Sequence, residues 1–147
     1  MIIYRAYPQI LEALSQMVAK ESVGGILDNI CGTLARLIIT NYALVPLKDV
    51  LPVFVQYLPL RSDFVENEYV FKSLSVIYSQ GSDILLQLLE KVILAALHVL
   101  SKKQYSKDEV RDFIFVFVKQ VRADFPEKFN NVVNSDPEIA IFVQSLS

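Results

Sequence analysis

The sequence predicts an all-α fold, an α-solenoid of about three antiparallel helix pairs followed by a short C-terminal helix. Apolar residues recur along most of the chain at the 3.6-residue spacing that makes one face of a helix. Prolines, glycines and acidic cap signals divide this pattern into segments of helix length. The second helix of each pair is expected to begin at Glu21, Asp63 and Ser106, which are 42 and 43 residues apart.

This regular step indicates the kind of solenoid. Repeats of about 40–47 residues built from two helices are typical of HEAT arrays. In such arrays each unit buries its apolar face only against its neighbours, which agrees with a hydrophobic content of 53%. We therefore expect residues 1–147 to be a single HEAT-repeat segment, the C-terminal fragment of a longer solenoid. A compact helical bundle is the alternative.

Local signals place the individual helices. Asp63-x-x-Glu66 and Ser106-x-x-Glu109 have the form of capping boxes, in which side-chain oxygens accept hydrogen bonds from the free N–H groups of a helix start. Together with the apolar period, these signals predict helix pairs at residues 8–19 with 21–40, 46–58 with 63–79, and 83–101 with 106–123.

Other segments are also interpreted as helix. Residues 113–118 have strand-like composition, yet a cap precedes them and helical neighbours surround them, so helix is favoured. Short helices are expected around residues 126–133 and from Pro137, with Asp136 capping the last one. Charged residues interrupt the most apolar segment, residues 84–100. A membrane span needs about 20 predominantly apolar residues, so this segment predicts a core helix.

The composition gives little support to an enzyme. Cys31 is the only cysteine and His98 the only histidine, so neither a disulfide framework nor a zinc-ligand spacing is present. A helical enzyme would need a pocket that gathers Asp28, His98 or Cys31, and the expected position of His98 on a first helix argues against it. No catalytic residue, metal or cofactor is predicted. The net charge of −2 disfavours non-specific nucleic-acid binding.

One side of the helix expected at residues 21–40 carries a stripe of small and polar groups. Its members are Glu21, Gly25, Asp28, Asn29, Gly32 and Arg36. A glycine inside a helix is disfavoured by about 0.5–1 kcal/mol relative to alanine. Either close helix packing or a ligand lying across the stripe must favour the bare backbone. Capping cannot explain Asp28 and Asn29, because they lie well inside the helix.

These polar residues are the candidate peptide-binding site. If the second helix of each pair lines a concave side, several of them lie in adjacent rows. The full candidate set is Glu21, Asp28, Asn29, Asp63, Glu66, Glu68, Asp108 and Asp112. Each carboxylate could accept hydrogen bonds from a lysine or arginine of an extended peptide, worth about 1.5–3 kcal/mol when partly desolvated. At Asp63, Glu66, Asp108 and Glu109, helix capping alone is the competing explanation.

Two segments, one repeat apart, match motifs of a known family. The first contains Asp28-Asn29, Gly32 and Leu34-Ala35-Arg36-Leu37-Ile38, and the second contains Leu58-Pro59-Leu60, Asp63, Glu66, Glu68 and Val70. The first resembles a helix of the late HEAT repeats in the importin-β (karyopherin) family of nuclear transport receptors, and the second resembles that family's "LPL…D…E.E..V" segment. The ending, residues 142–147, is similar to the carboxyl end of family members that carry core histones. Arg36, Lys72 and Lys119 depart from the pattern, because they are basic on the expected inner helices.

This resemblance implies the C-terminal HEAT repeats of a nuclear import receptor. The implied function is to bind a basic peptide, such as a core histone tail or a nuclear localisation signal, on an acidic concave face. Ran and nucleoporins would bind other parts of the full-length receptor, with no direct nucleic-acid contact, no membrane insertion and no cofactor. The implied location is the cytoplasm and nucleus. The alternative function is a structural HEAT-repeat scaffold for protein–protein assembly.

Overall fold

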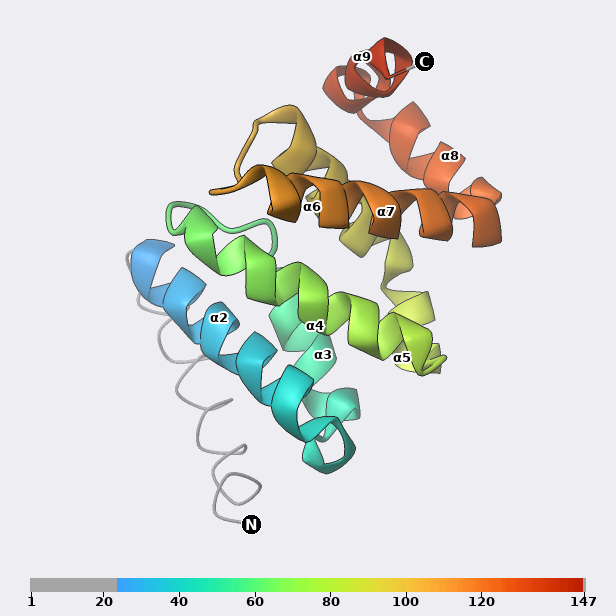
Figure 1. Ribbon diagram of the computed structural model, residues 1–147. Coiled ribbons are helices and arrows are strands. Elements are labelled where there is room, and N and C mark those ends of the chain that lie inside the picture. The colour runs from blue at the N-terminus through green and yellow to red at the C-terminus, as the bar shows by residue number, and fades with distance from the viewer. Residues whose placement is uncertain (1–23, 147) are drawn as a thin grey trace.

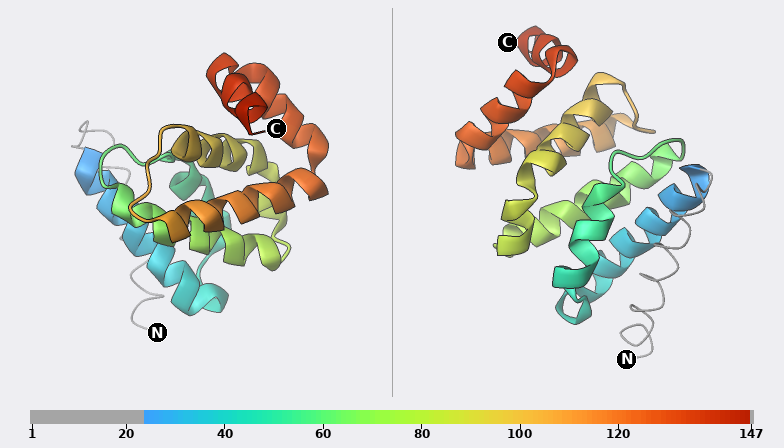
Figure 2. Two further views of the ribbon diagram at one scale, coloured as in Figure 1. Left: turned by 45° about the horizontal axis from the view of Figure 1, so that its top comes forward. Right: turned by 180° about the vertical axis from the view of Figure 1, so that it is seen from behind.

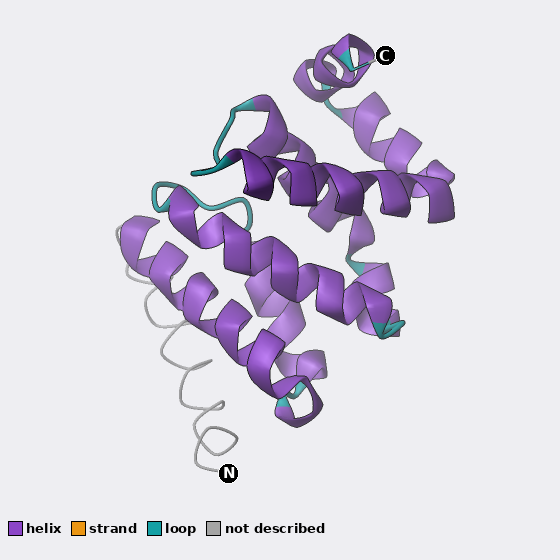
Figure 3. Cartoon of the chain, in the orientation of Figure 1, coloured by secondary structure: helices purple, strands orange, loops and turns teal. Residues whose placement is uncertain are grey.

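The structure is a computed structural model that describes residues 24–146. The helix expected at residues 8–19 and the candidate residue Glu21 lie outside the described residues. The elements are α2 (Gly24–Asn41), η1 (Tyr42–Leu44), α3 (Leu47–Gln56), η2 (Phe64–Glu66), α4 (Asn67–Ser79), α5 (Asp83–Gln87), α6 (Leu89–Ser101), α7 (Asp108–Asp124), α8 (Pro126–Ser135) and α9 (Pro137–Ser145). Within residues 24–146 there is no strand (Figure 3). Helix is therefore confirmed for residues 113–118, which lie within α7.

The helices form two layers. In one layer α2, α4 and α7 lie side by side, and α3 and α6 lie behind them (Figures 1 and 2). Within the first layer α2 packs on α4 and α4 packs on α7, whereas α3 packs on α5 and α6. The chain therefore returns to the same layer once in every repeat. This is the arrangement of a HEAT-like solenoid, and the predicted fold class is confirmed. At the C-terminal end, α8 and α9 pack on each other and on α6.

The core lies between the two layers and follows the apolar spacing of the sequence. Its largest fully buried side chains come from α2, α3, α4, α5 and α6. They are Leu34, Ile38, Leu51, Phe54, Phe71, Leu74, Ile77, Leu85, Leu89 and Ile93. Spacings of three and four residues put such side chains on one face of each helix. None of the described helices is long and apolar enough to cross a membrane.

Three local predictions were wrong. The helix expected at residues 83–101 is interrupted at Leu88, where φ is −103° and ψ is 6°, so α5 and α6 are separate. Asp63 and Ser106 do not cap their helices with side-chain hydrogen bonds: α4 follows a 3₁₀ turn, and α7 begins after Lys107. The cap of α9 is confirmed, because Asp136 accepts hydrogen bonds from the N–H groups of Glu138 and Ile139 at 3.0 and 3.2 Å.

Candidate functional site

Asp28 joins α2 to the loop that precedes α4. Its carboxylate accepts hydrogen bonds from the backbone N–H groups of Arg61 at 3.0 Å, and of Ser62 and Asp63 at 2.7 Å each. The residue is only 2% exposed. Because three N–H donors surround it, this buried charge is satisfied within the chain. Asn29, the next residue, is exposed. The structure therefore gives Asp28 a role in packing one repeat onto the next.

Gly32 lies directly beneath the side chain of Glu66. A Cβ atom at this position would overlap the Glu66 carboxylate and lie 3.0 Å from its Cγ. Glu66 is buried, and Nη2 of Arg36 lies 3.0 Å from each of its carboxylate oxygens. The Arg36 guanidinium also stacks over the Tyr69 ring, 4.2 Å from its centroid. Of the two explanations for a glycine in this stripe, the structure supports close packing at Gly32.

Replacing Gly32 by alanine should stabilise the chain only when Glu66 is absent. Alanine is favoured over glycine inside a helix by about 1 kcal/mol. In the wild-type chain this gain should be lost, because the new methyl group displaces the Glu66 carboxylate from Arg36. In a Glu66→Ala background, Gly32→Ala should stabilise the chain by about 0.5–1 kcal/mol. Urea unfolding of the four variants measures this difference, and equal effects in both backgrounds would contradict the proposed packing.

Asn67 makes the corresponding contact one repeat further on. It is fully buried at the start of α4, and its Nδ2 donates a hydrogen bond to the backbone carbonyl of Gln104 at 2.7 Å. Gln104 lies in the loop between α6 and α7. Asp28 on α2 therefore binds the loop that precedes α4, and Asn67 on α4 binds the loop that precedes α7. Both serve the stacking of repeats.

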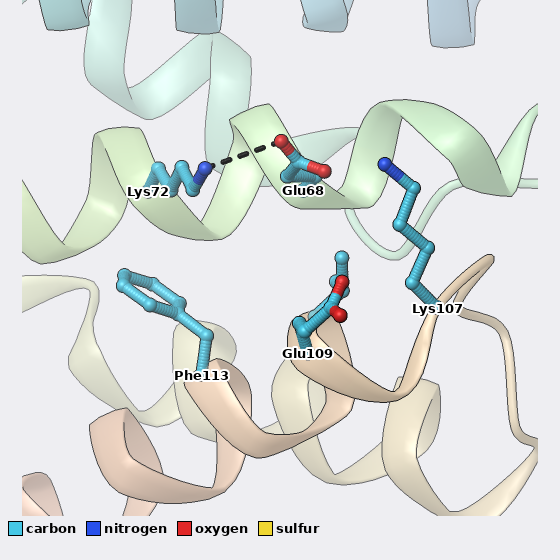
Figure 4. A pocket seen from close by; sticks show the side chains of 6 residues that line it. Glu68, Lys72, Lys107, Glu109 and Phe113 are labelled. Atoms are coloured by element: carbon cyan, nitrogen blue, oxygen red, sulfur yellow. Dashed lines mark hydrogen bonds and ion pairs between the residues drawn. The ribbon is translucent and has the colours of Figure 1, made fainter.

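A groove runs between α4 and α7. Its first hollow, of about 370 Å³, is lined by Glu68, Lys72, Lys107, Glu109, Val110 and Phe113 (Figure 4). Its second hollow, of about 450 Å³, is lined by Ser75, Tyr78, Ser79, Phe113, Val116, Phe117, Gln120 and Asp124. Phe113 borders both hollows, so they follow one another along the same two helices. We call the two hollows together the α4–α7 groove.

The first hollow contains two carboxylates and two lysines. Glu68 pairs with Lys72 at 3.1 Å, one helical turn along α4, and the Lys72 side chain is 46% exposed. Glu109 is exposed at the start of α7, and no described residue donates a hydrogen bond to its carboxylate. Exposed i,i+4 ion pairs contribute only about 0.3–0.5 kcal/mol. The Glu68 carboxylate can therefore exchange Lys72 for another cation at low cost.

The remaining predicted carboxylates lie outside this groove. Asp108 and Asp112 both pair with Arg111, at 3.5 and 3.1 Å. Asp112 borders a third hollow of about 510 Å³, which also includes Phe115 and Lys119. Asp63 lies in the loop before η2 and is half-buried. The structure thus brings Glu68 next to Glu109, a residue for which the sequence favoured a capping role. It does not place all the predicted carboxylates on one open surface.

Asp124 at the far end of the groove was missed from the sequence. It accepts hydrogen bonds from the Tyr78 hydroxyl at 2.5 Å and from Gln120 Nε2 at 3.0 Å. The pKa of the Asp124 carboxyl is lowered mainly by the hydrogen bond from Tyr78 and to a smaller extent by the one from Gln120. The pKa of Tyr78 is raised mainly by burial and to a smaller extent by the hydrogen bond to Asp124. A carboxylate in the last turn of a helix opposes the helix dipole, and this signal could have marked Asp124 as a residue held by nearby donors.

Cys31 and His98, two of the residues that a helical enzyme would have to bring together, lie in different layers. Cys31 is buried on α2, and burial, with Asp28 nearby, raises the pKa of its thiol to about 12. The thiol therefore stays protonated at neutral pH, where only a thiolate would be a good nucleophile. His98 lies on α6, in the other layer. Residues 24–146 contain no group of three or more His, Cys, Asp or Glu side chains that could hold a metal ion.

Stacked helix pairs with a groove along the second helices define the class of protein: an α-solenoid of helical repeats. The chain is homologous to two importins. It is 29% identical over 139 residues to "Probable importin subunit beta-4" of Schizosaccharomyces pombe, and 32% identical over 77 residues to "Importin-4" of Homo sapiens. These matches confirm the resemblance to importin-β-type receptors. No protein-family model matches the chain.

The two matches differ in extent. The first covers 94% of this chain and 13% of the fission yeast protein, and the second covers 52% of this chain and 7% of the human protein. The chain therefore corresponds to a small part of each relative.

Proposed function

We propose that the chain is a segment of a nuclear import receptor that binds a basic protein segment, such as a core histone tail or a nuclear localisation signal. The homology to two importins supports the receptor class. The main support for the binding site is the first hollow of the α4–α7 groove, which Glu68 lines from α4 and Glu109 lines from α7. Such a segment binds cargo without catalysing a reaction.

The chemistry of this hollow suits an arginine or lysine side chain. A guanidinium donates up to five N–H groups and can bridge two carboxylates, so it can replace Lys72 as the partner of Glu68 and reach Glu109 as well. Phe113 offers a ring face on which the same cation can stack. The exposed residues Asn29, Asp108 and Asp112 add polar and negative groups to the same helix layer, where they steer a basic segment.

The rest of the receptor's function is part of the same proposal. Ran and nucleoporins bind other parts of the full-length protein, and this segment contributes cargo affinity. The receptor moves between cytoplasm and nucleus. Neither a cofactor nor direct contact with nucleic acid or membrane is required.

A direct binding titration tests the site. A fluorescent basic peptide with the composition of a histone tail should bind at low salt, and binding should weaken as salt screens the charges. Since charge-assisted hydrogen bonds contribute about 1.5–3 kcal/mol each, Glu68→Gln combined with Glu109→Gln should weaken binding about tenfold or more. Fluorescence anisotropy measures the affinity.

Glu90→Gln is the matched control. Glu90 is an exposed carboxylate on α6, in the other layer, so its loss removes the same charge away from the groove. This variant should bind as the wild type does. Absence of binding at low salt, or an equal loss in the control, would contradict the proposal.

A structural scaffold is the second candidate. The buried contacts of Asp28 and Asn67 support it, because they use polar residues to stack repeats. A scaffold would show no affinity for basic peptides in the same titration.

A further inference from the structure

The α4–α7 groove has an apolar middle between two ends that each contain carboxylates. Val116 on α7 is 67% exposed and lines the second hollow. Phe113 and Phe117 line the same second hollow beside it. Exposed apolar surface in the middle of a groove favours a bound segment that covers it with an apolar side chain of its own.

The far end of the groove has a well-defined negative charge. Asp124 is held by the Tyr78 hydroxyl and Gln120, and the other residues lining the second hollow are uncharged. A carboxylate has about four acceptor positions, so Asp124 keeps capacity for a further donor. The near end has Glu68 and Glu109 together with Lys72 and Lys107, so a basic side chain binds there in exchange for a lysine. At the far end Asp124 has no lysine or arginine beside it among the residues that line the second hollow, so this end favours a cation.

The length of α7 gives the spacing between these ends. Glu109, Phe113, Val116, Gln120 and Asp124 follow one another by three or four residues, so they lie along one face of the helix. From Glu109 to Asp124 is fifteen residues, which at about 1.5 Å per residue spans roughly 22 Å. An extended peptide rises about 3.3 Å per residue and covers this distance in six or seven residues. Val116 lies close to the middle of the span.

We infer that the cargo segment of the α4–α7 groove is extended and carries two basic residues about six or seven positions apart, with an apolar residue midway. One basic residue binds at Glu68 and Glu109, the apolar residue covers Val116, and the second basic residue binds at Asp124. The inference rests on the proposed function and adds to it the spacing that the cargo must have. Asp124 thereby becomes a specificity-determining residue.

A spacing series of peptides tests this inference. Fluorescent Gly/Ser peptides carry two arginines separated by about three to ten positions, with a leucine midway, and a further peptide carries one arginine only. Because both ends engage at once only when the spacing matches, affinity should peak at six or seven positions, about five- to tenfold above the extremes. Fluorescence anisotropy with the full 147-residue chain measures each affinity.

Two variants and a control link the optimum to the groove. Asp124→Asn should lower the affinity of the best peptide about tenfold and leave that of the single-arginine peptide unchanged. Val116→Ser should weaken peptides with the midway leucine more than those with serine at that position. Glu90→Gln should change neither. Equal affinity at all spacings, with binding still dependent on Glu68 and Glu109, overturns this inference alone. Absence of all binding overturns the proposed function as well.

Discussion

Replacing Asp28 with alanine is expected to destabilise the chain by about 3–5 kcal/mol, because each buried donor left without an acceptor costs about 1–3 kcal/mol. The substitution removes the acceptor of three backbone N–H groups, those of Arg61, Ser62 and Asp63. Residue 28 is 2% exposed, so water cannot replace the carboxylate without opening the contact between α2 and the loop before α4. The urea midpoint, read by circular dichroism, should fall accordingly.

Asp28→Asn and Asp49→Ala are the controls. Asparagine keeps one acceptor oxygen but places an NH₂ group against the remaining donors, so it should be less destabilising than alanine. Asp49 is exposed in the first turn of α3, where its loss should cost less than about 1 kcal/mol. If Asp28→Ala weakened peptide binding without a change in stability, the packing role would be wrong and the peptide contact expected from the sequence would be favoured.

Replacing Phe71 with alanine should destabilise the chain by a similar amount, about 3–5 kcal/mol, since large-to-small changes of a buried aromatic residue create a cavity. Phe71 is 1% exposed on α4, the helix that packs on both α2 and α7. In a repeat array, stability is the sum of the repeats and of the interfaces between neighbours. A cavity at α4 should therefore weaken its interfaces with both α2 and α7. The unfolding transition should then become broader and its midpoint lower.

Phe142→Ala is the matched control for that substitution. Phe142 is half-buried on α9 at the end of the array, where the same loss of volume affects only the terminal helices. Phe142→Ala should lower the free energy of unfolding clearly less than Phe71→Ala does. The effect of Phe71→Leu should lie between those of the two alanine substitutions. Equal effects of the two alanine substitutions would contradict the central position of α4.

The sequence predicted most of the described helices and the order in which they stack, but not the break at Leu88 that separates α5 from α6. A 3.6-residue apolar period is a local property, so it predicts helices from neighbouring residues alone, including residues 113–118 despite their strand-like composition. The step of 42 to 43 residues then predicts a repeat array. The exact helix starts were less predictable: Asp63 and Ser106 match the capping pattern, but their side chains make no cap hydrogen bond.

The sequence by itself determined an all-α solenoid with a stripe of small and polar residues on one side of α2. Only the tertiary structure decided what those residues do. Asp28 meets its donors 33 to 35 positions further along the chain, and Gly32 faces Glu66 on the next repeat. Glu68 and Glu109 likewise come from different repeats. The role of a carboxylate depends on which donors surround it, and in this chain those donors are brought close only by the stacking of repeats.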